Sequence, residues 1–243
     1  MNTPLLVAEE VGAVFRNAER SFAVYTEHFE VCEGETILLN APSGAGKSSL
    51  LALLGGALKP DSARKLDVRT RKGDVIDLAS AWRDTDERAI IRARREVFGF
   101  VLQTGALAAF LTVRENIELC LMLQNEDEPS DINYLAEALN IQDLLGLKPP
   151  QLSVGQRQRV AIARALISAP TVVLADEPTA SLDVVLADEV DRVLADCVRR
   201  QACMIMASHR PDASTWRGAA MAEFRTDRNE DMVASVFNYR NAA

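Results

Sequence analysis

The sequence predicts an α/β protein with a mostly parallel central sheet, an N-terminal antiparallel β-subdomain and an inserted α-helical subdomain. Residues 172–175 and 202–207 are short apolar runs, which suit central strands of a parallel sheet that is covered on both faces. The stretch 184–200 between them has one apolar face, with Asp183 placed to cap it, acids early and arginines late, as the helix dipole favours. Strand, helix and strand in that order indicate a right-handed crossover unit.

The first half of the chain predicts an antiparallel sheet at the edge of the domain, followed by helices and strands in alternation. Short β-like runs separated by charged and small residues favour antiparallel pairing. These runs are 5–8, 21–30 and 36–40. A helix is expected at 46–54, ended by two glycines. After it we expect strands at 65–69 and 74–78, a charged helix at 84–95 and a buried strand at 97–102.

The second half predicts a helical insertion and a terminal hairpin. Residues from 112 to about 150 read as short amphipathic helices, with a polar break at 125–131, and a further helix is expected at 155–168. The tail 219–237 predicts a hairpin whose polar turn lies at 226–231.

Length and composition favour a folded domain of ordinary size. The chain has 243 residues, of which 48% are hydrophobic and 26% charged, so it can bury a real core and is not disordered. We expect one domain over 1–243, in which a helical subdomain at about 106–168 is inserted into a core made by 1–105 and 169–243.

Composition also excludes several classes of protein. Lys plus Arg number 27 against 35 for Asp plus Glu, a formal net charge of −8, which argues against a general nucleic-acid binder with a basic face. The four cysteines have no paired spacing and the two histidines are too few for a zinc cluster, so a reducing compartment fits. The N-terminus lacks the pattern of a secretory signal, and the longest uncharged run, 97–113, favours a buried strand and a loop over a membrane span.

A glycine-rich loop at 40–49 predicts a site for phosphate groups. It follows an apolar strand, opens a helix and ends in Gly-Lys-Ser, and its small residues let successive backbone N–H groups point at phosphate oxygens. Lys47 would reach the terminal phosphates and the Ser48 hydroxyl would take a place on Mg²⁺. Ala41 stands where the strict pattern has glycine, a minor departure. The alternative is a strand-to-helix turn that binds nothing.

An acid pair follows the apolar strand at 172–175. The carboxyl ends of parallel strands point at the ligand crevice, so Asp176 and Glu177 should face the same cleft as Lys47. Asp176 is suited to hold Mg²⁺, and Glu177 could orient or deprotonate an attacking water. The alternative is a pair of solvated loop acids. His209 follows the next apolar strand and could touch the terminal phosphate, whereas His28 reads as structural.

The order of motifs from Phe15 to His209 resembles that of the ABC-type ATPases. Residues 152–166 resemble their signature segment, and 176–183 resemble their second phosphate motif with the adjoining D-loop. The resemblance implies a P-loop NTPase core, the cofactors ATP and Mg²⁺, and a homodimer in which the loop of one copy faces the signature of the other.

The resemblance also implies a role for each residue of the site. Gln103 looks like the Q-loop glutamine, His209 like the switch histidine, and Phe15 stands where an aromatic stacks on adenine. The implied catalytic residues are Glu177, His209, Lys47 and Gln103, and the implied ligands of Mg²⁺ are Ser48, Gln103 and Asp176. The implied ATP-binding residues are Phe15, Ala41, Pro42, Ser43, Gly44, Ala45, Gly46, Lys47, Ser48 and Ser49, with Ser153, Gly155 and Gln156 acting across the dimer.

Three further segments, 53–56, 112–116 and 150–153, look like the lipoprotein-releasing, macrolide-exporter and cell-division group of ATP-binding subunits. This resemblance implies a separate integral membrane permease as partner, contacted by the Q-loop and the region 106–124. It also implies a cytoplasmic location, peripheral on the inner face of the inner membrane, and no nucleic-acid partner.

Val154 stands where the family's signature has glycine, and its bulk could slow closure or hydrolysis. The sequence therefore leaves open an alternative, an ATP-binding regulatory or scaffolding subunit of an envelope complex with little turnover. A soluble ABC ATPase of DNA repair or translation is disfavoured, because the chain has no room for a coiled-coil insertion or a second cassette. A P-loop kinase is disfavoured because it lacks the signature segment.

Overall fold

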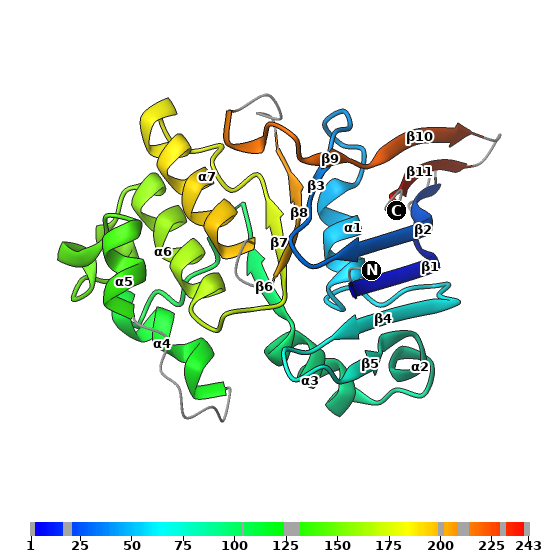
Figure 1. The fold of residues 1–243 in the computed structure, drawn as a ribbon, viewed down its shortest axis with the longest axis horizontal. Coiled ribbons are helices and arrows are strands. Elements are labelled where there is room, and N and C mark those ends of the chain that lie inside the picture. The colour runs from blue at the N-terminus through cyan, green and yellow to red at the C-terminus, as the bar shows by residue number, and fades with distance from the viewer. Residues whose placement is uncertain are drawn as a thin grey trace.

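A computed structural model describes residues 3–16, 21–103, 105–123, 132–198, 202–208, 214–228 and 232–240. They form two sheets with helices around them, so the predicted α/β class is confirmed (Figure 1). The strands are β1 Pro4–Arg16, β2 Ser21–Cys32, β3 Thr36–Leu39, β4 Lys65–Arg69, β5 Val75–Asp77, β6 Phe98–Val101, β7 Val172–Asp176, β8 Cys203–Ala207, β9 Ala220–Met221, β10 Glu223–Arg228 and β11 Met232–Asn238. The α-helices are α1 Lys47–Leu54, α2 Leu78–Arg83, α3 Glu87–Glu96, α4 Val113–Leu123, α5 Ile132–Ala138, α6 Val154–Leu166 and α7 Val184–Val198.

The central sheet is parallel, with strand order β6-β7-β8-β3-β9. Alternate residues of its strands enter two different hydrophobic cores. In β7, Val172 and Leu174 pack in the core that contains α1, whereas Val173 and Ala175 pack in the core that contains α6 and α7. Because successive side chains of a strand point to opposite faces, burial on both faces requires a continuous apolar run, as predicted for β7 and β8.

The second sheet has the order β10-β11-β2-β1-β4-β5 and is antiparallel except where β11 runs parallel to β2. Figure 1 shows α1 between the two sheets and α5, α6 and α7 on the other side of the central sheet. The antiparallel sheet near the N-terminus is thus confirmed. The helices of the predicted insertion lie together, but the boundary at about 106–168 stays a prediction.

Two predictions for the first half of the chain were wrong. The run 36–40 was assigned to the antiparallel sheet, but as β3 it pairs with β8 and β9 in the central sheet, because both of its faces are buried. The first strand was expected to end at residue 8, yet β1 continues to Arg16, since it pairs with β2 along its whole length. Arg64 forms ion pairs with Glu9 and Glu10 within it.

The predicted helix 84–95 is present as α3, which begins three residues later, whereas the separate short helix before it, α2, was not predicted. The Asp77 side chain caps α2 by accepting a hydrogen bond from the Ser80 backbone N–H at 2.9 Å. The Asp86 side chain caps α3 by accepting from the backbone N–H groups of Arg88 and Ala89. The left-handed backbone of Thr85, with φ of 57°, separates the two helices.

The terminal hairpin is correct in part. β10 and β11 pair antiparallel as predicted, whereas β9 belongs to the central sheet, where it pairs with β3. Part of the predicted turn, 229–231, lies outside the described residues.

The close approach of β6 to the end of α6 gives a test of the packing. A Cβ at Gly99 would lie 2.5 Å from the Ala165 carbonyl oxygen and 2.7 Å from Pro170 Cγ. Because backbone cannot yield as a flexible side chain can, Gly99→Ala should lower the free energy of unfolding by about 1–3 kcal/mol. Urea denaturation measures the loss. The control Gly146→Ala, which meets nothing within 4 Å, should change stability by less than about 0.5 kcal/mol; equal losses would contradict the packing argument.

Candidate functional site

The register of the central sheet brings the predicted site segments to one edge. Leu39, the last residue of β3, pairs with Ala207 of β8, and Ala207 pairs with Asp176 of β7. Val101 of β6 pairs with Ala175, one residue before Asp176. The glycine-rich loop, the acid pair and the segment containing Gln103 therefore leave three strands of one sheet at its carboxyl edge, where α/β sheets bind ligands.

Lys47, at the end of the glycine-rich loop, hydrogen-bonds to carbonyl oxygens at the start of the same loop. Lys47 is 7% exposed, and its ammonium donates to the carbonyl oxygens of Ala41 at 2.7 Å and Pro42 at 3.2 Å. Gly44 and Gly46 have φ of 77° and 84°, a region that glycine enters without steric cost. The loop ends at the first turn of α1, whose N–H groups have no intrahelical acceptors and suit an anion.

Strand β2 supports the loop from behind. A Cβ at Gly46 would collide with Val24 Cγ2 and lie 3.1 Å from Phe22 Cζ. Phe22 pairs across the strands with Phe15, and the two ring centroids are 6.3 Å apart. Phe15 is 39% exposed, so a π face stands beside the loop where the sequence placed a partner for a base.

Gln103 contacts Glu177, the second acid of the pair. Gln103 Nε2 donates to Glu177 Oε2 at 3.4 Å, a long contact that places both side chains in one small region. Glu177 has φ of 49°, and its backbone N–H donates to the Ala207 carbonyl at 2.9 Å. A non-glycine residue in this conformation costs of order 1–3 kcal/mol and persists where the surroundings fix it, often at functional sites. His209 lies outside the described residues, as does Thr104.

The signature segment forms the start of α6 and presents its serine to solvent. Ser153 Oγ accepts from the Gln156 N–H at 3.2 Å, and Gln156 Oε1 accepts from the Ser153 N–H at 2.8 Å, a reciprocal cap. Ser153 is exposed and Val154 is 59% exposed. The neighbours of Gly155 belong to the segment before α7, since a Cβ there would lie 2.9 Å from Leu182 Cδ2. This end of α6 adjoins the D-loop rather than the glycine-rich loop.

Two polar residues of α6 hold the chain on both sides of Gln103, and sequence reasoning gave them no role. Arg164 donates to the carbonyl oxygens of Gly105 at 2.9 Å and Ala106 at 2.7 Å, and Gln158 Nε2 donates to Leu102 O at 3.4 Å. Desolvation lowers the pKa of the Arg164 guanidinium. The available signal was a charged side chain on a helix that is otherwise mostly buried.

Asn116 organises the loop that leads into α4. It is fully buried, its amide NH₂ donates to the carbonyl oxygens of Ala108, Leu111 and Thr112, and its oxygen accepts from the Ala108 N–H at 2.8 Å. A buried polar group with all of these partners fixes a loop in one conformation. The sequence marked this residue only as part of a family-like segment.

The fold and this edge define a class, the α/β proteins that bind nucleotide phosphates in a loop between a parallel strand and the helix after it. The chain belongs to the ABC transporter family, whose pattern matches residues 26–180. It is therefore an ATP-binding cassette and an ATPase. A relative of known structure was solved in the state that follows ATP hydrolysis, which supports this activity.

Three relatives illustrate the similarity. The lipoprotein-releasing system ATP-binding protein LolD of Legionella pneumophila is 36% identical over 184 residues, 74% of this chain and 76% of that protein. The macrolide export ATP-binding/permease protein MacB of Marinobacter nauticus is 34% identical over 215 residues, 87% of this chain but 32% of that protein, so this chain spans about a third of the exporter's length. The dimeric, post-hydrolysis structure of the cassette MJ0796 with ADP and Pi has a TM-score of 0.68 at 30% identity, covering 84% of this chain and 88% of that one.

None of the helices in the described parts of the chain combines the length and the apolar character needed to cross a bilayer.

The contact between the glycine-rich loop and β2 predicts a specific defect. Gly46→Ala should lower the affinity for a fluorescent ATP analogue at least about tenfold, because strain and the collision with Val24 displace the loop. Fluorescence titration measures the affinity. Gly34→Ala is the control, since φ is 81° there but nothing lies within 4 Å. It should cost about 1–2 kcal/mol of stability and leave ATP affinity unchanged; an equal loss of affinity in both variants would show that the contact with β2 is irrelevant.

Proposed function

We propose that this protein is the ATP-hydrolysing subunit of a transport or mechanotransmission complex and works as a homodimer on a separate integral membrane permease. The observation that carries this proposal is the placement of the signature serine. Ser153 is exposed at the start of α6, while the glycine-rich loop lies at the carboxyl edge of the sheet with Glu177 and Gln103. A second copy would complete each site by presenting its Ser153, Gly155 and Gln156 to the γ-phosphate held by the loop.

The residues at the edge fit Mg²⁺, which prefers oxygen ligands. Ser48 offers an exposed hydroxyl, Asp176 a half-exposed carboxylate, and Gln103 an amide oxygen that the contact of its NH₂ group with Glu177 leaves available. When bound, Mg²⁺ neutralises charge on the phosphate oxygens. The chain's own contribution is to position these donors beside the loop.

Hydrolysis requires that the phosphates and an attacking water be held in line. Lys47 would exchange its two loop carbonyls for phosphate oxygens, and the N–H groups of the first turn of α1 would hold the same phosphates. Glu177 would orient or deprotonate the water, with Gln103 beside it and His209 reaching the terminal phosphate. Phe15 would stack on the base. Loss of the γ-phosphate would remove what joins the copies, and the dimer would loosen.

An exposed apolar surface supports a permease partner. On the region 106–124, Phe110 is 76% exposed, Met122 is 72% exposed and Leu119 is 39% exposed. Large apolar side chains left exposed within one short segment favour an interaction site there. The names of LolD and MacB support lipoprotein release or export as the process that ATP hydrolysis powers. In this proposal the subunit is cytoplasmic and peripheral on the inner face of the inner membrane. No nucleic-acid partner is proposed.

The alternative, a regulatory or scaffolding subunit with little turnover, rests on Val154 and Ala41. Valine leaves the cap of α6 intact, since Ser153 and Gln156 still satisfy each other. Ala41 still supplies the carbonyl oxygen that Lys47 contacts. Neither departure removes a group that the proposed mechanism uses, so the hydrolysing subunit is the better supported proposal.

The shared site predicts that ATP holds the dimer together when hydrolysis is blocked. Glu177→Gln should bind ATP and elute as a dimer with ATP and a monomer without it, because the amide cannot deprotonate water while the phosphate contacts remain. Size-exclusion chromatography with light scattering measures the mass. Adding Ser153→Arg to Glu177→Gln should abolish the dimer and leave ATP binding intact.

A monomeric Glu177→Gln variant in saturating ATP would contradict the shared-site proposal. The turnover of wild type against Lys47→Ala separates the two candidate functions. Activity of the wild type well above that of Lys47→Ala supports the hydrolysing subunit, and equal activities favour the scaffold.

The permease surface predicts a separable loss of partner binding. Phe110→Asp with Met122→Asp should abolish copurification of the membrane partner from detergent-solubilised membranes, because two charges would be buried against apolar partner groups. ATP binding should stay at the wild-type level. Val75→Asp, at a 50% exposed valine of β5, is the matched control and should copurify normally. Retention of the partner by the double variant would place the permease contact elsewhere.

A further inference from the structure

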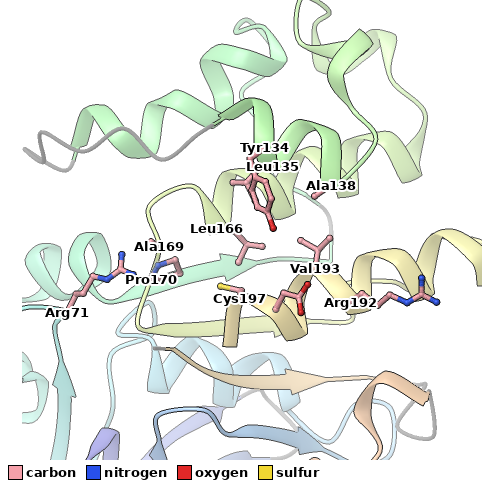
Figure 2. A pocket seen from close by; sticks show the side chains of 11 residues that line it. Arg71, Tyr134, Leu135, Ala138, Leu166, Ala169, Pro170, Arg192, Val193 and Cys197 are labelled. Carbon is pink, nitrogen blue, oxygen red and sulfur yellow. The ribbon is translucent and has the colours of Figure 1, made fainter. Parts of the chain in front are cut away.

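A cavity of about 480 Å³ lies where the helical part of the chain meets the central sheet. It is bounded by α5, by the end of α6 with the loop into β7, and by the second half of α7. Figure 2 shows Tyr134 of α5 pointing toward Leu166 of α6 and Val193 of α7. The volume is within the range of about 300–1,000 Å³ of sites that hold small molecules.

The wall of the cavity is mainly apolar. Leu135, Ala138, Leu166, Pro170 and Val193 supply carbon atoms to it from three different elements. Leu166 is only 6% exposed and lies deep in the cavity, whereas Tyr134 is 48% exposed and lies at its opening. An apolar ring or chain would find contacts on several sides here, and Cys197 lines the same cavity.

The polar groups of the cavity favour a negative charge on its occupant. Arg71, Arg192 and Asp196 line it, giving two cationic groups against one anionic group. Figure 2 shows the arginines at opposite ends, with Arg71 directed toward Ala169 and Arg192 directed outward. Within the ranges that the structure describes, Arg71 has no ion-pair partner. An acidic head group at this end would gain a charge-assisted hydrogen bond.

The position of the cavity distinguishes it from the nucleotide site. The helix α6 begins at the signature segment and ends at the cavity, and α7 begins after Asp183 and passes along the cavity with its second half. Phosphate-binding and acidic residues of the nucleotide site do not line it. An occupant would touch α5, α6 and α7 together and would resist movement of α5 relative to α7.

We infer that this cavity is a binding site for a small amphipathic anion, with an apolar body among Leu135, Leu166 and Val193 and an acidic head group at Arg71. The site lies apart from ATP and goes beyond the proposed function, and its occupancy does not depend on a permease.

Two dyes with the same ring system test the proposal. Anilinonaphthalene sulfonate carries an anionic group, and N-phenylnaphthylamine is its uncharged counterpart. Both are titrated by fluorescence into the full chain with saturating ADP, which fills the nucleotide site. Ala138→Trp, which fills the cavity from the end of α5, should weaken both dyes at least about tenfold. Glu137→Trp, at an exposed neighbour that does not line the cavity, should bind both like wild type.

The charge of the ligand is tested at Arg71. Arg71→Gln should weaken the sulfonate about two- to fivefold, as suits an exposed cation, and leave the uncharged dye unchanged. Lys72→Gln removes the next cation of the same turn, which does not line the cavity, and should affect neither dye. An unchanged sulfonate affinity in Arg71→Gln, or an equal loss in Lys72→Gln, would overturn the assignment to an anion.

A measurement on the wild type keeps the test independent of how the variants fold. Saturating sulfonate should slow alkylation of Cys197 by iodoacetamide at least about fivefold, read peptide by peptide by mass spectrometry, while Cys120, half-buried on α4 outside the cavity, should react at an unchanged rate. If Cys197 is not protected by the sulfonate, or if Ala138→Trp and Glu137→Trp lose dye affinity equally, the proposed binding site is wrong.

Discussion

The parallel pairing of β3, β8 and β7 is the constraint on which the rest of the structure depends. Leu39, Ala207 and Asp176 stand in one row across these strands, so the segments that follow them leave the sheet at the same level. This register is fixed by burial on both faces, because a slip of one residue would move every side chain of β7 into the other core. The chemistry at the edge therefore inherits its geometry from the packing of apolar side chains several ångströms away.

Backbone conformations that are costly alone are held in place by this sheet. Glu177 adopts φ of 49° directly after β7, and its N–H is tied to the last residue of β8. Gly46 has φ of 84° with β2 against its Cα, so the loop cannot relax toward the second sheet. Each position is fixed by two elements, so the fold itself holds the glycine-rich loop and Glu177 in place. Rigid placement of this kind is what phosphoryl transfer to water needs.

The sequence could predict those parts of the site that are written in consecutive residues. The glycine-rich loop at 40–49 and the acid pair at the end of β7 follow local rules, so their positions at strand ends were predictable. The sheet that β3 joins was not, because four apolar residues fit either sheet until their partners are known. The contact of Arg164 with Gly105 is likewise long-range, and no local pattern announces an arginine that binds carbonyl oxygens 59 residues away. Predictability thus ends where a residue's role depends on a distant partner.

The side chain of Ser153 can serve two purposes at once, and this explains why serine suits the start of α6. Its oxygen accepts from the Gln156 N–H as a cap, an interaction worth about 1 kcal/mol to the helix. A hydroxyl is also a donor, so its proton stays available to a phosphate oxygen of ATP bound in the loop of a second copy. Aspartate would cap the helix equally well but has no proton to donate and would repel the phosphate. The cap fixes the orientation of the hydroxyl before the proposed dimer forms, so closure need not spend free energy on ordering this side chain.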